Sequence, residues 1–298
     1  MNIEHLRALS AIVDAGSFEA AADLLGVTPS AVSQRIKALE KSVGQVLVRR
    51  TLPSSPTDAG SVVLRMARQV QTLEAEVMED MSGGAASRGV VSVSLNADSL
   101  ATWFTPVLHE AAGWGDTDLD LRIQDQDHSS HLLRQGVVVG AVTTDPKPIG
   151  GCHAEPLGVM RYVPTVSPKL LQRFDTSEGI NWSKMPMLRF AHNDDMQHQF
   201  IRSRGVRQFP PVHTIPSSEG FLEAVHAGLG WGMLPQIQLQ EDHRQDLLVP
   251  LEEQLHYDVL LYWHRWSLSS ARLERVTQAV RKASSKLLQI EDLHMSLH

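Results

Sequence analysis

The chain has a single cysteine, Cys152, among its 298 residues, and this excludes an internal disulfide and fits a reducing cytoplasm. No apolar run reaches the roughly 20 residues needed to span a membrane. The first residues, MNIEHLRALS, lack the basic start and apolar core of a signal peptide. We therefore expect a cytoplasmic protein with no membrane partner, in which Cys152 is a packed thiol rather than a nucleophile.

The sequence also lacks the patterns of enzyme and metal sites. The glycines of 228–232 (GLGWG) are not followed by the lysine of a phosphate-binding loop. Ser217 and Ser218 do not form a nucleophile elbow, and no base can be assigned to them. His128 and His131 have metal-ligand spacing, but no third ligand accompanies them. We therefore expect no catalytic residue, no metal site and no cofactor.

Positive charge is scarce overall but concentrated in one segment. The net charge is −7. Between Thr28 and Arg50, however, five cations face one acid, Glu40, so this segment carries +4 and the rest of the chain −11. A basic module in an acidic chain is typical of a DNA-binding domain. Since one such module binds weakly, we expect a dimer that places two modules on DNA.

Residues 17–42 carry the signals of a helix-turn-helix. Ser17 can cap a first helix, on which we expect Leu24 and Leu25 to face a core, and Gly26 can end that helix in the left-handed conformation. Thr28 then caps a second helix, with Pro29 at its first position. The alternative is an ordinary surface hairpin of helices.

The second helix has a buried stripe and a polar outer face. The stripe comprises Val32, Ile36 and Leu39. Small hydroxyls, an amide and cations on the other face suit the major groove, where Gln34 can read a base edge and Arg35 and Lys37 can contact phosphates. The predicted DNA-binding residues are Ser17, Thr28, Pro29, Ser30, Ser33, Gln34, Arg35, Lys37, Arg49 and Arg50.

The elements around this motif complete a winged DNA-binding domain, which we place at 1–58. Residues 3–14 predict a helix that packs Ile3, Leu6, Leu9 and Val13 behind it. A short two-stranded wing follows Gly44 and carries Arg49 and Arg50. Thr57 caps a long helix, 58–81, whose partly heptad spacing favours pairing with a second subunit over packing on its own domain. With the hinge-like residues 82–87, it forms a linker at 59–87.

Strands and helices alternate from residue 90 onward, which predicts a doubly wound α/β domain over 88–298. One lobe comprises about 88–163 and 265–290, and the other about 164–264. The predicted strands are 90–95, 118–123, 137–142, 187–190, 212–215, 232–234 and 259–263, and the predicted helices are 99–112, 129–136, 195–203, 218–228 and 269–289. Two such lobes imply a ligand cleft at the carboxyl ends of strands.

Longer motifs resemble a known family. The segments SFEAAADLLGVTPSAVSQRIKALEKSVGQVLV and PTDAG resemble the DNA-binding part of LysR-type transcriptional regulators. NADSLATWF, VVGAVTT, SSEGF, GLGWGMLP and LYWHRW are similar to the ArgP/LysG branch, over nearly the whole chain to about residue 290. This resemblance implies a periplasmic-binding-protein-like effector domain, a homodimer or homotetramer, and activation of an exporter gene by a basic amino acid (lysine, arginine or histidine). Its partners would be double-stranded DNA, the amino acid, a second copy and RNA polymerase.

The resemblance and the residues together predict an effector site. An amino acid's carboxylate can meet a helix start at Ser99 and Thr102, Asp98 can meet its ammonium, and Trp103 can cover its aliphatic part. A cationic side chain needs acceptors, for which carboxylates at strand ends are suited. Plain helix capping by Asp98 and Ser99, and exposed loop charges at Asp194 and Asp195, are the alternatives. The predicted effector-binding residues are Asn96, Asp98, Ser99, Thr102, Trp103, Asp125, Asp127, His128, Thr143, Thr144, Ser217, Ser218 and Glu219.

Three functions compete with this one. The chain can be a chromosome- or origin-binding protein that inhibits replication initiation. It can be a LysR-type regulator with a different effector. It can also be an enzyme derived from a binding protein, although no nucleophile and base pair supports that interpretation.

Overall fold

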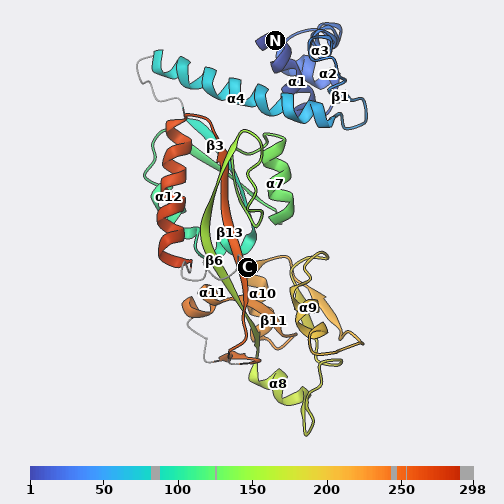
Figure 1. Cartoon of the computed structure of the whole chain (residues 1–298), viewed down its shortest axis with the longest axis vertical. Helices are drawn as coiled ribbons and strands as arrows, with labels where there is room; N and C mark the ends of the chain where they lie inside the picture. Colours follow the sequence, from blue (N-terminus) through green and yellow to red (C-terminus); the bar gives the residue numbers. More distant parts are fainter. Residues whose placement is uncertain (82–87, 125, 243–246, 253, 289–298) are drawn as a thin grey trace. The chain divides into compact units, whose positions relative to one another are not determined.

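The computed structural model describes residues 1–81, 88–124, 126–242, 247–252 and 254–288 (Figure 1). They form two compact units, and each is described separately. The first unit comprises Met1–Leu95, Ala111–Glu155 and Trp263–Thr277, and the second comprises Asn96–Glu110, Pro156–Tyr262 and Gln278–His298. The predicted hinge at 82–87 lies outside the described residues. Within these ranges, no helix is long and apolar enough to cross a membrane.

The N-terminal part has the predicted winged helix-turn-helix. Its elements are α1 (Ile3–Ala15), α2 (Phe18–Leu25), α3 (Pro29–Val43), β1 (Val48–Arg49), β2 (Ser55–Pro56) and α4 (Asp58–Met81). The caps are those the sequence indicates: the Ser17 hydroxyl accepts from the Ala20 amide at 3.0 Å, and the Thr28 hydroxyl from the Ala31 amide at 3.2 Å. Gly26 ends α2 with a φ of 63°. Local capping signals therefore place this turn.

A single apolar core joins α1, α2, α3 and the first half of α4, and it contains Val32, Ile36 and Leu39 as predicted. Two apolar predictions are wrong. Leu24 is 68% exposed, because it lies two positions after buried Ala22 and thus about 200° around the helix. Ile3 is 44% exposed at the first position of α1.

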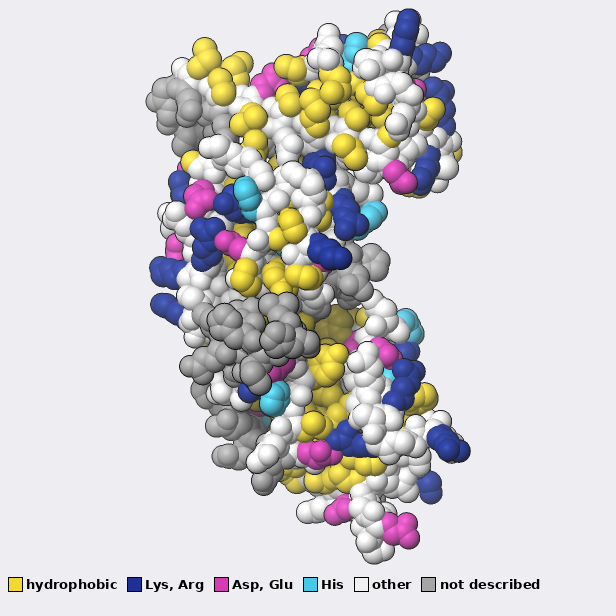
Figure 2. Space-filling view, viewed as in Figure 1, with side chains coloured by type: hydrophobic (Ala, Val, Ile, Leu, Met, Phe, Trp, Pro, Cys, Tyr) yellow, Lys and Arg dark blue, Asp and Glu magenta, His cyan; other side chains and the backbone are white. Residues whose placement is uncertain are grey.

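The long helix α4 has two apolar faces. Val63, Leu64 and Ala67 pack into the core of the DNA-binding domain. Val62, Leu73, Val77, Met78 and Met81 are 41–78% exposed, and Figure 2 shows hydrophobic side chains at the carboxyl end of this helix. The helix therefore packs on its own domain and also keeps an uncovered apolar surface.

The rest of the first unit is built on parallel strands. β3 (Gly89–Leu95) pairs in parallel with β4 (Thr117–Ile123) and β5 (Gly140–Thr143), and β13 (Tyr257–Trp266) adjoins β5. α7 (Gln126–Arg134) belongs to this unit, and α12 (Ala271–Leu287) belongs to it as far as Thr277. Gly140 is required here, because a Cβ on it would lie 2.4 Å from the Trp263 ring.

The second unit combines antiparallel and parallel pairs. β11 (Gly232–Pro235) and β12 (Val249–Pro250) run antiparallel to β6 (Cys152–Val166), while β9 (Met187–Arg189) and β10 (Val212–Thr214) are parallel. A small antiparallel pair joins β7 (Asp175–Thr176) and β8 (Gly179–Ile180). Its helices are α5 (Ala97–Ala101), α6 (Thr105–Ala111), α8 (Pro168–Phe174), α9 (Met196–Arg202), α10 (Ser218–His226) and α11 (Gln236–Glu241).

The α/β class is confirmed, with several local differences. β6 is a long strand that the sequence analysis did not predict, because Pro156, Gly158 and Pro164 resemble strand breakers. The helix predicted at 99–112 is two helices, α5 and α6, since the chain turns at Thr102. The short helices α8 and α11 were also not predicted.

Candidate DNA interface and effector site

The outer face of α3 is polar and open. Thr28, Pro29, Ser30, Gln34 and Lys37 are exposed, while Ser33 is half-buried. Lysine and arginine side chains stand along the outer edge of this domain (Figure 2). Because Val32, Ile36 and Leu39 hold the opposite face in the core, this face is fixed outward. Ser17, half-buried at the start of α2, is occupied by capping.

The predicted phosphate contacts differ in how they are held. The Arg35 guanidinium lies 3.2 Å from Glu4 and its side chain is only 26% exposed, so it stabilises the junction of α1 and α3. Arg50 is exposed, and its guanidinium lies 4.9 Å from the centre of the Phe18 ring. Arg49 is exposed 3.8 Å from Asp58. Arg49 and Arg50 are therefore more available to DNA than Arg35.

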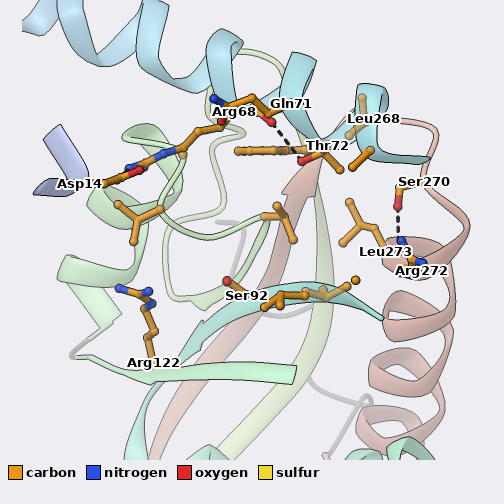
Figure 3. A pocket seen from close by; sticks show the side chains of 18 of the residues that line it. Asp14, Arg68, Gln71, Thr72, Ser92, Arg122, Leu268, Ser270, Arg272 and Leu273 are labelled. Atoms are coloured by element: carbon orange, nitrogen blue, oxygen red, sulfur yellow. Dashed lines mark hydrogen bonds and ion pairs between the residues drawn. The ribbon is translucent and has the colours of Figure 1, made fainter. Parts of the chain in front are cut away.

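A cavity of about 830 Å³ lies inside the first unit, between α4 and the end of the sheet (Figure 3). Its wall includes Arg68, whose guanidinium donates to the Asp14 carboxylate on α1 and to the Gln135 carbonyl oxygen at 2.9 Å. One side chain thus joins the DNA-binding domain to the turn that follows α7. None of the predicted effector-binding residues lines this cavity.

The centre of the predicted effector site is Asp98, in the second unit. Its Oδ1 accepts from the Ser218 hydroxyl at 2.8 Å, and its Oδ2 accepts from the Tyr162 hydroxyl at 3.0 Å. Asp98 is therefore not simply a helix cap; Asn96 fills that role, accepting from the Ser99 amide at 3.0 Å. The motif at 96–104 and the one at 217–221 are thus brought together, as the effector prediction requires.

Electrostatics make Asp98 unusual. Desolvation raises the pKa of its carboxyl above the ordinary value of 3.8, and nearby Asp194 and Glu219 raise it further, against the hydrogen bonds from Ser218 and Tyr162. Desolvation, followed by the charge of Asp98, raises the pKa of Tyr162 well above 10. The tyrosine therefore keeps its proton and remains a donor to Asp98.

The neighbours of Asp98 differ in their availability. Ser99 is fully buried, and its hydroxyl oxygen has no hydrogen-bond partner among the described residues. Thr102 donates to the Asp98 carbonyl oxygen at 2.6 Å, and Trp103 is fully buried against Phe104. At the start of α10, the Ser217 hydroxyl accepts from the Gly220 amide at 3.2 Å and donates to Glu219 at 3.3 Å.

The remaining predicted residues belong to the first unit. Thr143 is buried, with its hydroxyl 3.2 Å from that of Ser130, and Thr144 is half-buried beside it. Asp127 and His128 lie on α7. Asp125 lies outside the described residues.

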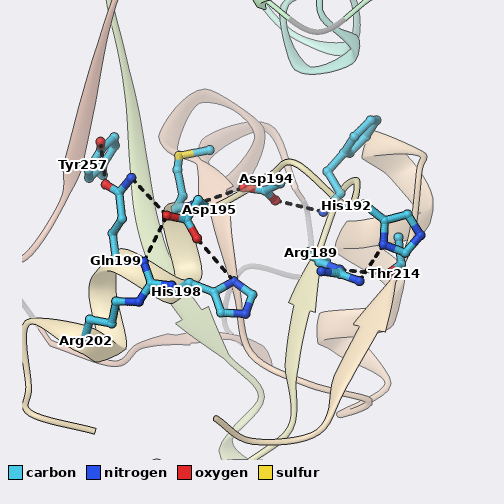
Figure 4. A network of polar contacts seen from close by, with 11 residues as sticks. Arg189, His192, Asp194, Asp195, His198, Gln199, Arg202, Thr214 and Tyr257 are labelled. Carbon is cyan, nitrogen blue, oxygen red and sulfur yellow. Dashed lines mark hydrogen bonds and ion pairs between the residues drawn. The ribbon is translucent and has the colours of Figure 1, made fainter. Parts of the chain in front are cut away.

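Asp194 and Asp195 serve their own loop and helix (Figure 4). Asp194 accepts from the Phe190 amide at 2.9 Å, and Asp195 faces Gln199 and Arg202, each at 3.4 Å. The alternative of local structural roles therefore describes these two carboxylates.

Two residues at this site were missed by the sequence analysis. Tyr162 lies on the unpredicted strand β6, and Gln238 lies on the unpredicted helix α11, where its amide nitrogen is 3.4 Å from the Ser218 hydroxyl and carbonyl oxygens. No sequence pattern marks either residue, because each reaches Asp98 or Ser218 only through the tertiary fold.

No group of three or more potential metal ligands gathers among the described residues. Cys152 is buried, and desolvation raises the pKa of its thiol, which describes a packed thiol.

Comparison with known families covers both parts of the chain. Residues 3–61 match the bacterial regulatory helix-turn-helix protein model of the lysR family, and residues 84–285 match the LysR substrate binding domain. The chain belongs to the LysR family of transcriptional regulators. It is a DNA-binding regulator and not an enzyme, as the sequence analysis predicted.

Individual relatives fall within the ArgP/LysG branch that the motifs resemble. The lysine export transcriptional regulatory protein LysG of Corynebacterium efficiens is 46% identical over 286 residues, covering 95% of this chain and 98% of LysG. Full-length LysG of Corynebacterium glutamicum, solved with bound effector Arg, is 42% identical with a TM-score of 0.87, over 97% of this chain and 100% of that one. ArgP of Mycobacterium tuberculosis is 45% identical with a TM-score of 0.86, over 96% and 98%.

Proposed function

We propose that this LysR-family regulator senses a basic amino acid, arginine or lysine, through Asp98 and controls an amino-acid exporter gene. The observation that carries the proposal is the set of partners of Asp98. Both carboxylate oxygens accept hydrogen bonds from neutral hydroxyls, and none of the ion pairs between described residues includes this carboxylate.

Such a carboxylate has an unmet electrostatic demand. Removing an ionised carboxylate from water is costly unless a cation compensates it. Here the two charged side chains that act on the carboxyl, Asp194 and Glu219, are of the same sign and raise its pKa. A ligand with an ammonium or guanidinium group supplies this cation and can donate hydrogen bonds to the Asp98 carboxylate.

Two relatives support this choice of ligand and gene. The LysG of Corynebacterium glutamicum binds arginine as its effector, and the LysG of Corynebacterium efficiens is named for lysine export. The effector residues proposed around Asp98 are Asn96, Ser99, Thr102, Trp103, Ser217, Ser218 and Glu219, while Thr143, Thr144, Asp125, Asp127 and His128 stay predictions from the sequence.

The DNA-binding side of the proposal uses the whole winged domain, 1–58, with the ten residues named above, and the linker 59–87. The uncovered apolar face of α4 is the expected contact with a second copy, which gives a homodimer or homotetramer that places two modules on double-stranded DNA in the cytoplasm. Effector binding would bias the arrangement of these modules and so the recruitment of RNA polymerase.

Calorimetric titration tests the effector claim. The purified chain should bind arginine or lysine but not leucine, and Asp98→Asn should weaken that binding at least tenfold, since a charge-assisted contact is lost. Asp175→Asn, an exposed carboxylate on β7, is the matched control and should bind like the parent. Failure of the parent to bind either amino acid would refute the proposal and leave a LysR-family regulator with another effector.

Citrulline is an analogue of arginine in which a neutral group replaces the guanidinium. Comparing the two ligands shows whether Asp98 contacts the side-chain cation or the α-ammonium. If Asp98 meets the side-chain cation, Asp98→Asn should reduce arginine affinity strongly and citrulline affinity little. If Asp98 meets the α-ammonium, both ligands should lose affinity equally.

A further inference from the structure

We propose that Gln238 is a further effector-binding residue, whose side-chain carbonyl oxygen accepts a hydrogen bond from the same cationic ligand that Asp98 binds. This inference rests on the proposed function and deepens it. It adds a second, neutral acceptor from a helix that no sequence motif marked.

The orientation of the Gln238 amide follows from its neighbours. The Ser218 hydroxyl donates its one proton to Asp98 Oδ1 at 2.8 Å, so this oxygen can only accept from Gln238. The Ser218 backbone carbonyl oxygen can only accept as well. Both lie 3.4 Å from Gln238 Nε2. Only the NH₂ end of the amide satisfies both acceptors, and Oε1 must therefore point away from Ser218.

The Oε1 atom that results is buried and has no hydrogen-bond partner among the described residues. Buried side-chain acceptors are rarely left without a donor in folded proteins. The Ser99 hydroxyl, next to Asp98 in sequence, is in the same condition. Two unpaired polar atoms thus accompany the carboxylate that lacks a cation.

The fold holds Gln238 in place without using its carbonyl oxygen. α11 begins directly after β11, whose four residues are buried and paired with β6. β6 also carries Tyr162, the second donor to Asp98. Asp98 and Gln238 are thereby anchored through common neighbours, and Gln238 Oε1 is left without a donor among the described residues.

The chemistry of this set favours a ligand rich in donors. A guanidinium offers five N–H donors and an ammonium three, and neither has an acceptor. One carboxylate cannot satisfy five donors that leave water together. A neutral amide oxygen beside it provides an additional acceptor without adding a fourth carboxylate to Asp98, Asp194 and Glu219.

Arginine titration of Gln238→Leu and Gln238→Glu tests the contact. Gln238→Leu should weaken arginine binding about tenfold, the effect of one lost hydrogen bond to a charged group. Gln238→Glu keeps an acceptor at this position. It should bind arginine about tenfold more tightly than Gln238→Leu does. Gln240→Leu, on the exposed face of α11, is the control and should match the parent.

A double-mutant cycle separates ligand contact from mere support of Ser218. If Gln238 touches the ligand, Gln238→Leu should weaken arginine binding about tenfold again in a Ser218→Ala background. An absence of further loss there would overturn the inference, because Gln238 would then act only through Ser218. Thermal melts of each variant with saturating arginine verify that the chain is folded.

Failure of the proposed function and failure of the Gln238 contact give different binding results. If the parent binds neither arginine nor lysine, the proposed function itself is wrong. If the parent binds arginine, Asp98→Asn does not, and Gln238→Leu equals the parent, only the role of Gln238 is refuted.

Discussion

Replacing Tyr162 with phenylalanine should make arginine binding more sensitive to acid. The Tyr162 hydroxyl donates to Asp98 Oδ2 at 3.0 Å, and its own raised pKa keeps it protonated throughout the useful pH range. This hydrogen bond favours the ionised carboxylate. Its loss adds to the desolvation that already raises the pKa of Asp98.

The size of the effect follows from the bond removed. A hydrogen bond to a charged group contributes about 1.5–3 kcal/mol. At a pH where Asp98 is largely protonated in the variant, arginine must first displace that proton, so its affinity should fall about 10- to 100-fold relative to the parent. At a pH well above the pKa of Asp98, the loss should be much smaller, because the carboxylate is ionised in both proteins.

Calorimetry with arginine across a pH series measures this difference. The acid limb of the Tyr162→Phe profile should move to higher pH. Tyr257→Phe is the control: its hydroxyl donates to Gln199 Oε1 at 3.2 Å in the network of Figure 4, and the variant should keep the parent profile. Identical pH profiles for the parent and Tyr162→Phe would refute the role assigned to Asp98.

Two further predictions concern DNA binding and acid stability. Arg50→Ala should weaken binding to all double-stranded sequences alike. It should also reduce the slope of log affinity against log salt by about 0.9 for each lost phosphate contact. An electrophoretic or fluorescence titration in which the variant loses discrimination at one base pair only would contradict this. Asp116 has its pKa lowered to about 2 by the hydrogen bond from Arg275, so its stabilisation is present above pH 4 and is lost as pH falls toward 2. Because both side chains are more than one-third exposed, Asp116→Asn should lower the free energy of unfolding at pH 7 by less than about 1 kcal/mol, and urea unfolding at pH 7 and pH 3 should show that difference shrinking in acid.

The elements that could be predicted from the sequence are those specified by local signals. Ser17, Gly26 and Thr28 lie within one turn of the helix ends they determine, and their capping bonds span three residues. The limits of α4 at 58 and 81 likewise follow from Thr57 and a sustained apolar repeat. Capping depends on residues that are close in sequence, so it can be predicted from the sequence alone.

The effector site could be predicted only in part, because its contacts are long-range. Asp98 and Ser218 stood out at helix starts, although 120 positions separate them. Tyr162 is 64 positions from Asp98. It lies on a strand that was not predicted because its prolines resemble strand breakers. Gln238 sits on a six-residue helix with no buried residue, for which no apolar periodicity exists.

The order in which the chain is made has a consequence for its assembly. Among the described residues, the core of the DNA-binding domain comprises residues between Leu6 and Val70. The first unit, by contrast, needs Trp263–Thr277, and the second closes with residues after Gln278. Since domains fold as units during synthesis from the N-terminus, a DNA-binding core is complete long before either unit. A chain that stops short of Trp263 would therefore contain the described core of the DNA-binding domain and lack part of each unit.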